Sequence, residues 1–438
     1  MNTNEKYELA NLVMDHALKN GAGQASVSIN DSRRSNIDIR DQKIDKLTES
    51  VRNSLTIELY VDKKYSAHST SRLKKEELFR FVEEAIAATR FLAEDEFRSL
   101  PDPELYYKGG AADLLILDSK LDDVDAKTKI ELATRVHDEA FGKDDRIISV
   151  TSSYSDRISN RILVTSNGFR GDSSSSNVSL SADVSVKGET GRPSDSWYEN
   201  SIFLDKLIKT DIGGKALERA IRKLGPKKIK SGKYPVIIEN RTVSSVLYPL
   251  YSAMLGSSIY QKQSFLIGKE NKAVASTKLT VYDEPFIQSG LGSALFDSEG
   301  LATARRPIIE GGILRNFYID TYYGKKLKMK PTSGDSTNLI FTAGTRDLNS
   351  MIQGLDKGIF ITGFNGGNCN GSTGDFSYGI EGFYIEKGKM IHPVNEMNIT
   401  GNMNQFWFSL IELGNDVLDN EAFKTPSMMF EKADLSGI

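Results

Sequence analysis

The sequence predicts an α+β fold, with an N-terminal domain of helices and an antiparallel sheet followed by a β-dominated C-terminal domain. Apolar residues recur at helical spacing in separate segments of the first half. Runs with a period of two lie between those segments, as half-buried strands require. The second half has many short apolar runs and turn signals but few long helical patterns. At 438 residues the chain is long enough for two domains that each bury a core.

The elements expected in the first half are four helices and a set of alternating strands. Helices are expected at residues 7–20, 74–92, 125–141 and 214–224, and alternating runs at residues 25–29, 37–39, 55–59, 158–165 and 178–186. Gly21 stands where a glycine commonly ends a helix. The alternating runs predict a twisted antiparallel meander, and Asn167-Gly168 is a strong hairpin signal between two of them.

A domain boundary is expected near residue 228. Gly225-Pro226 ends the fourth helical segment, a lysine-rich polar stretch follows, and Tyr234 to Ile238 opens a new strand. The chain therefore divides into an N-terminal α+β domain of residues 1–227 and a C-terminal β-rich domain of residues 228–438.

Charge and cysteine content exclude several classes of protein. The 56 Lys and Arg against 59 Asp and Glu give a net charge of -3, without the basic excess that attracts nucleic acids. A single cysteine, Cys369, forms no intramolecular disulfide, which favours a reducing compartment. No apolar stretch is long enough to be an export signal or a membrane span. We therefore expect a cytoplasmic protein that binds neither nucleic acid nor membrane.

The four histidines do not have the spacing of a zinc site. His16, His68, His137 and His392 are far apart, and the sequence has no His-Glu-x-x-His motif, which would place two imidazoles one helical turn apart. Ordinary surface or half-buried roles are favoured for all four.

Nucleophile and acid/base candidates are also few. Cys369 has no histidine near it in sequence to activate it, and the serine run 173–176 lacks a nucleophile-elbow pattern. Asp297 and Glu299 precede Arg305 and Arg306 closely, a composition that suits either a general acid/base or a buried ion-pair network. Structural pairing is the favoured interpretation, so residue types and spacing alone identify no catalytic set.

Three C-terminal segments carry a resemblance to a known family. They are Phe296-Asp297-Ser298-Glu299-Gly300 with residues 304–314, then Ser372-Thr373-Gly374-Asp375-Phe376 continuing to Gly388, and finally Ile399-Thr400-Gly401-Asn402-Met403 with residues 414–416. Together they resemble the PmbA/TldE branch of the TldD/PmbA metalloproteases, historically called modulators of DNA gyrase. The resemblance implies that Asp297, Ser298, Glu299, Arg305, Arg306, Gly374 and Asp375 are family-signature residues with structural or interface roles rather than catalytic ones.

The same resemblance implies that this chain holds no catalytic zinc. TldD-type subunits of the family carry a His-Glu-x-x-x-His helix and a later cysteine that together bind zinc. The corresponding helix here is expected at residues 242–256 and reads Tyr248-Pro249-Leu250-Tyr251-Ser252-Ala253, and the later segment reads Ala422-Phe423-Lys424-Thr425-Pro426. Neither supplies a histidine or cysteine ligand, so zinc is expected only in a TldD-type partner.

By family analogy, the chain is a subunit that works with a TldD-type protein in proteolysis or maturation of small peptides, such as microcin precursors and antitoxins. A homodimer is also possible by the symmetry of such families. The glycine-rich segment 363–374 is a candidate edge for an extended peptide. Two alternatives stay open: a non-proteolytic binding protein that modulates DNA gyrase or its toxins, and an autonomous hydrolase that uses Asp297, Glu299 or Cys369.

Overall fold

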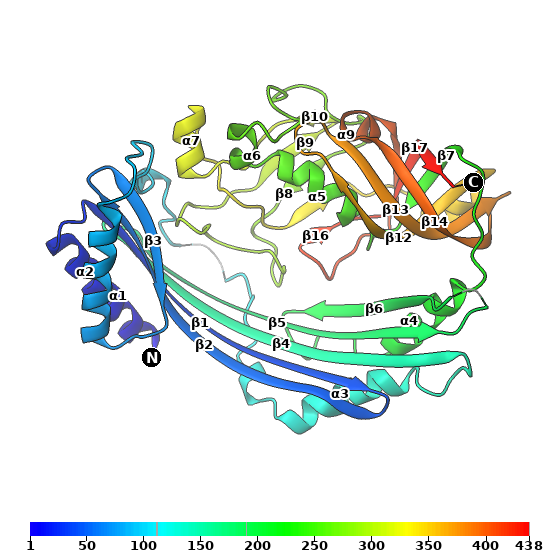
Figure 1. Ribbon diagram of the computed structural model, residues 1–438, viewed down its shortest axis with the longest axis horizontal. Coiled ribbons are helices and arrows are strands. Elements are labelled where there is room, and N and C mark those ends of the chain that lie inside the picture. Colours follow the sequence, from blue (N-terminus) through cyan, green and yellow to red (C-terminus); the bar gives the residue numbers. More distant parts are fainter. Residues whose placement is uncertain (111–112, 190, 438) are drawn as a thin grey trace.

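The computed structural model describes residues 1–110, 113–189 and 191–437, and its elements form an α+β protein as predicted (Figure 1). The N-terminal half builds one long, curved antiparallel sheet. Its strands are β1 (Gln24–Arg40), β2 (Lys43–Val61), β3 (Lys64–Thr70), β4 (Ile147–Thr165), β5 (Arg170–Val186) and β6 (Ser194–Ser201). The order across the sheet is β3-β2-β1-β4-β5-β6. The runs expected at 25–29 and 37–39 are therefore two ends of a single strand, β1.

Four helices cover one face of this sheet, close to the predicted ranges. They are α1 (Thr3–Lys19), α2 (Lys75–Thr89), α3 (Ala126–Asp138) and α4 (Ile212–Arg222). On β1, Val27, Ile29, Ile37 and Ile39 are all buried, because residues two apart point to the same face. The first two pack in a core under α1 and α2, and the last two pack in a second core under α3 and α4. Figure 1 shows the C-terminal domain on the opposite, concave side.

The turn between β4 and β5 confirms the hairpin prediction. Gly168 has a φ of +108°, a conformation that side chains with a Cβ rarely adopt, and its amide donates to the Thr165 carbonyl. The tight turn lets β5 run back along β4 for its whole length.

The C-terminal half contains a six-stranded sheet that closes on itself. Its order is β14-β13-β12-β7-β17-β15, and an additional pairing joins β14 to β17. The strands are β7 (Gly232–Ile238), β12 (Lys357–Cys369), β13 (Asp375–Glu386), β14 (Lys389–Asn402), β15 (Leu410–Leu413) and β17 (Met428–Ser436). β7 and β12 run parallel, which requires the long connection that holds the rest of the domain.

That connection carries most of the short helices and four strands of a smaller sheet, whose fifth strand, β16, comes from later in the chain. The strands, in the order β10-β9-β8-β11-β16, are β8 (Val281–Asp283), β9 (Arg306–Glu310), β10 (Ile313–Leu314), β11 (Leu339–Phe341) and β16 (Phe423–Lys424). The helices are α5 (Ser244–Ala253), α6 (Gly256–Tyr260), α7 (Thr321–Leu327), α8 (Leu348–Gln353) and α9 (Met403–Phe406). The helix expected at 242–256 thus ends earlier, and a second short helix follows it.

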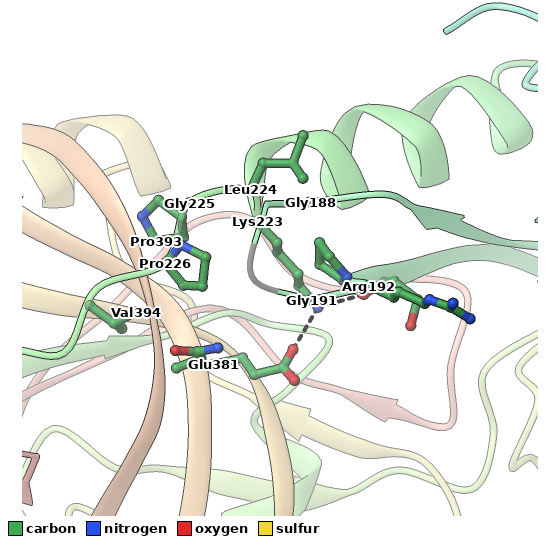
Figure 2. Close-up of a pocket in the computed structure, with 13 residues that line it drawn as sticks. Gly188, Gly191, Arg192, Lys223, Leu224, Gly225, Pro226, Glu381, Pro393 and Val394 are labelled. Atoms are coloured by element: carbon green, nitrogen blue, oxygen red, sulfur yellow. Dashed lines mark hydrogen bonds and ion pairs between the residues drawn. The ribbon is translucent and has the colours of Figure 1, made fainter. Parts of the chain in front are cut away.

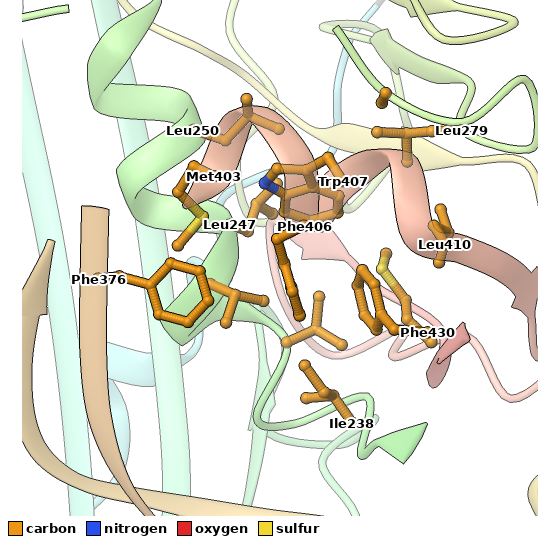
Figure 3. Close-up of a cluster of buried hydrophobic side chains, with 14 of the residues drawn as sticks. Ile238, Leu247, Leu250, Leu279, Phe376, Met403, Phe406, Trp407, Leu410 and Phe430 are labelled. Carbon is orange, nitrogen blue, oxygen red and sulfur yellow. The ribbon is translucent and has the colours of Figure 1, made fainter. Parts of the chain in front are cut away.

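The C-terminal core forms where the closed sheet meets α5. Val236 and Ile238 of β7 point into this core, whereas Ile237 between them packs on the outer face against α8 residues. Figure 3 shows Leu247 and Leu250 of α5 packed against an aromatic group that includes Phe406, Trp407 and Phe430. The rings of Phe406 and Phe430 stack with centroids 4.1 Å apart.

Charged side chains join the two halves of the chain beside the expected boundary, which falls between α4 and β7. Arg219 of α4 donates two hydrogen bonds to Glu239, at 2.6 and 2.9 Å. Figure 2 shows Lys223 reaching toward Glu381. The Lys223 ammonium donates to the Glu381 carboxylate at 2.7 Å and to the Ser194 carbonyl at 3.0 Å. These contacts are partly buried, so they contribute more to fixing the position of the C-terminal domain over the concave face than exposed ion pairs would.

None of the helices in the described part of the chain is both long and apolar enough to cross a membrane.

The packing of Phe430 predicts a large effect of truncation. Phe430 is fully buried, so Phe430→Ala removes a stacked ring and leaves a cavity, and we expect it to lower the free energy of unfolding by about 3 to 5 kcal/mol. Phe91→Ala is the matched control, because Phe91 is 90% exposed and its loss should change stability by less than about 0.5 kcal/mol. Denaturant unfolding of both variants measures the difference, and equal effects would contradict this account of the core.

Candidate functional site

The family-signature carboxylates build a turn that rests on the N-terminal sheet. One oxygen of Asp297, Oδ1, accepts hydrogen bonds from the amides of Glu299 and Leu301, each at 2.9 Å. Glu299 Oε2 accepts from the Thr321 amide at 2.9 Å, at the start of α7. From β4, Arg161 donates to the Ser298 carbonyl at 2.6 Å. Both carboxylates therefore hold backbone in place where the two domains meet.

Burial at this junction shifts the protonation of both groups. Burial raises the pKa of Asp297 above its ordinary value, although the backbone amides of Leu301, Glu299 and Gly334 oppose the shift. Burial likewise raises the pKa of Glu299 to about 7, and the negative charge of Asp297 adds to that rise. A carboxyl that titrates near neutral pH suits a general acid/base, but Glu299 is already engaged in a backbone hydrogen bond.

Arg305 and Arg306 do not pair with Asp297 or Glu299. Arg305 Nε lies 2.9 Å from Glu284 Oε2, and Arg306 Nη2 lies 3.1 Å from Asp283 Oδ2. The cause is the register of β8 with β9, which sets Asp283 directly opposite Arg306. The sequence therefore indicated correctly that these arginines form ion pairs, but it did not identify Asp283 and Glu284 as their partners.

Gly374 directly precedes β13 and Asp375 is its first residue, at a point where two signature segments meet. Asp375 accepts hydrogen bonds from Asn402 and from the Thr373 hydroxyl, each at 2.7 Å. The bond from Asn402 contributes most to lowering the pKa of Asp375, so this carboxylate is ionised at neutral pH. Gly374 has a φ of +82° and provides the reversal. The pairing of β13 with β14 brings residues 375–379 beside residues 398–402.

The glycine-rich segment at residues 363–374 is constrained by its own neighbours. A Cβ on Gly367 would lie 2.1 Å from the Ser377 carbonyl oxygen, so this glycine permits β12 to approach β13. Burial raises the pKa of Cys369 to about 11, which keeps the thiol protonated at neutral pH. An activated cysteine nucleophile is therefore not supported here.

Aromatic rings occupy the place where the family resemblance puts the metal ligands. Tyr248 and Tyr251 of α5 both contact Phe423, with ring centroids 5.6 and 5.9 Å apart. The helix and the later segment, more than 160 residues apart in sequence, are thus brought together in space. Pro249 lies inside α5 between the two tyrosines. The sequence identified both segments, but only the fold puts them in contact.

These residues do not fit a zinc ion. Burial raises the pKa of Tyr251, so its phenol stays protonated rather than becoming an anionic ligand. Across residues 1–110, 113–189 and 191–437, no group of three or more His, Cys, Asp or Glu side chains could hold a metal. Each histidine has a separate local partner: His16 bonds Glu83, His68 bonds Ser66, His137 meets the Gln42 amide and His392 meets the Pro393 carbonyl.

A polar cavity of about 590 Å³ lies between the concave face of the N-terminal sheet and the C-terminal domain. Ser159, Ser175, Asn177 and Asn200 line it from the sheet, and Glu421 and Ala422 close it from the other side. Hydroxyl and amide side chains can both donate and accept, so this lining can match a peptide main chain. Ala422 directly precedes Phe423, which links the cavity to the aromatic group on α5.

Comparisons with known proteins assign the family. Residues 25–89, 119–224 and 231–437 match the family models described as domain 1, the central domain and the C-terminal domain of the PmbA/TldA metallopeptidases. The chain belongs to the PmbA/TldD metallopeptidase family. A Haemophilus influenzae protein named metalloprotease PmbA homolog is 28% identical over 438 residues, which cover 99% of this chain and 96% of that protein.

Solved structures have the same fold. A Bacteroides thetaiotaomicron protein described as a candidate modulator of DNA gyrase is 47% identical, with a TM-score of 0.98 and coverage of 100% of both chains. TldE from Thermococcus kodakarensis is 19% identical, with a TM-score of 0.88 over 98% of this chain and 100% of that one, and this likeness concerns the fold alone. The N-terminal half therefore shares the family's architecture as fully as the C-terminal half does.

The raised pKa of Glu299 predicts that the free energy of unfolding depends on pH. The folded protein retains a proton to about pH 7 that the unfolded chain loses near its ordinary pKa of 4.5, so Glu299 contributes most to stability at low pH and less as pH rises to 7. Glu299→Gln keeps an acceptor for the Thr321 amide but does not titrate. We expect its free energy of unfolding, relative to the parent protein, to rise by roughly 1 to 3 kcal/mol between about pH 5 and pH 8. A difference that is independent of pH would refute the assignment.

Proposed function

We propose that this chain is the zinc-free, PmbA/TldE-type subunit of a two-subunit TldD/PmbA metalloprotease. The replacement of metal ligands by Tyr248, Tyr251 and Phe423, within a fold that belongs to a metallopeptidase family, carries this proposal. A site without imidazole, thiolate or carboxylate ligands neither holds zinc nor polarises a zinc-bound water. Chemistry would then reside in a TldD-type partner, and this chain would contribute binding surface and enclosure.

The expected substrate is a small, unfolded peptide in the cytoplasm. The polar cavity supports this proposal, because its serine and asparagine side chains can bond the backbone of an extended chain without selecting one sequence. Microcin precursors and antitoxins are substrates of this kind by family analogy. Glycine-rich β12 is a weaker candidate for contact with the peptide, because Gly367 is needed for pairing within the protein.

A second candidate function is direct modulation of DNA gyrase or of its toxins without proteolysis. The description of the Bacteroides thetaiotaomicron relative favours it. The near-neutral charge of -3 gives no support for binding to DNA itself, so this alternative requires a protein or peptide contact.

Zinc content distinguishes a ligand-free subunit from an independent protease. After dialysis of the full chain against a weak chelator, we expect far fewer than one zinc per chain, because the residues that the structure describes provide no ligand set. Elemental analysis measures this directly, with a TldD-type subunit treated in parallel as the positive control. About one tightly held zinc per chain would overturn the proposal.

Peptide cleavage tests the role of the cavity. The full chain alone should cleave no peptide, and addition of the TldD-type subunit from the same genome should produce cleavage. Ser175→Trp would fill part of the cavity, and we expect it to lower kcat/KM of the complex by roughly ten-fold or more, since about 1.4 kcal/mol corresponds to that factor. Ser71→Trp, at an exposed position between β3 and α2 and outside the cavity lining, is the control. Unchanged cleavage with Ser175→Trp would remove the cavity from the proposal.

A further inference from the structure

One edge of the N-terminal sheet is open over a long distance. On its outer side β2 pairs with β3 only through Leu55 to Val61, so the segment from Lys43 to Ser54 has no strand beside it among the described residues. Its twelve residues, 43 to 54, extend roughly 40 Å at the usual rise of a strand. Figure 1 shows β3 beside only the part of β2 near α1 and α2. We call Lys43 to Ser54 the open edge.

The open edge carries exposed apolar side chains. Val51 is 72% exposed, Ile44 50% and Leu47 48%. Ile44 and Leu47 lie opposite Ile39 and Ile37 of β1, which are buried beneath α3. The exposed side chains of Ile44 and Leu47 are therefore next to the apolar core on the same face of the sheet. Natural edge strands are commonly shortened or covered, because a long edge with free amides and carbonyls recruits another strand. The open edge therefore has the features of an interface.

The charges of the open edge disfavour pairing with a second copy. Two copies related by a two-fold axis could join their sheets through this edge with the helix-covered faces of both on the same side. Residues that point to the same face would then lie opposite each other. Setting Leu47 opposite Val51 of a second copy places Glu49 opposite Glu49 and Lys46 opposite Arg52. Setting Leu47 opposite Leu47 places Asp45 opposite Glu49. Like charges directly opposite each other are destabilising, so charge opposes both registers that set Leu47 opposite Leu47 or Val51 of a second copy.

We propose that the open edge binds a β-strand of the TldD-type partner, which extends the sheet of one subunit into that of the other. This inference rests on the proposed function and adds the surface through which the subunits join. The complementary strand would carry apolar residues opposite Leu47 and Val51, an acidic residue opposite Lys46 or Arg52, and a basic residue opposite Glu49. Main-chain hydrogen bonds would hold the strand, and this charge pattern would select a partner chain over a second copy.

Hydrogen–deuterium exchange and binding measurements test the open edge with the full chain and the purified TldD-type subunit from the same genome. In the complex, we expect amides of residues 43–54 to become protected from exchange. The double variant Leu47→Lys, Val51→Lys should weaken the complex by at least about ten-fold, as loss of apolar interface anchors does. Both positions are exposed, and edge lysines are common in native sheets, so the variant should fold normally. Ile208→Lys is the control, because Ile208 is 54% exposed in the segment between β6 and α4.

Three outcomes would overturn the inference. If the double variant bound the TldD-type subunit with unchanged affinity, the open edge would be rejected as the interface. The same would follow if the amides of residues 43–54 were not protected from exchange in the complex, and in both cases the proposed function would stand. Absence of any complex between the two parent proteins would overturn both. A homodimer that the double variant dissociates would assign the open edge to a second copy of this chain.

Discussion

The antiparallel pairing of β1 with β4 is the interaction on which the rest of the structure depends. Fifteen consecutive residue pairs, from Ser26 with Thr165 to Arg40 with Thr151, join two hairpin systems that residues 71–146 separate along the chain. The family models treat those systems as two domains, at residues 25–89 and 119–224. Their union into one sheet aligns the apolar sides of all the strands, so that four helices cover one face and the polar face becomes concave.

The C-terminal domain packs against the concave face of the N-terminal sheet. Arg219 of α4 bonds Glu239, and Lys223, directly after α4, bonds Glu381. Arg161 of β4 bonds the turn at Ser298. These contacts lie at separate points of the junction, and a polar cavity lies between the domains. The signature carboxylates Asp297 and Glu299 belong to this junction, which gives them a structural role that is independent of chemistry.

Much of the fold was predictable from local patterns, but the site was predictable only in part. The helices and the Asn167-Gly168 hairpin follow from periodicity and turn chemistry, which act over a few residues. The length of β1 did not, because polar residues from Asn30 to Asn36 interrupt its apolar pattern while its hydrogen bonds continue. The partners of Arg305 and Arg306 were also missed, since strand register across a sheet is set by tertiary packing.

By itself, the sequence determined the types of side chain that are available: no set of metal ligands with suitable spacing, one cysteine, near-neutral charge and an α+β pattern. These are properties of composition and short-range order, which the chain carries before it folds. Only the tertiary structure decided that α5 meets Phe423 through aromatic rings, that a cavity forms above the concave face, and that β3 leaves part of β2 uncovered. Each of these depends on contacts between residues that are distant in sequence or on where a strand ends, and local propensity does not encode either.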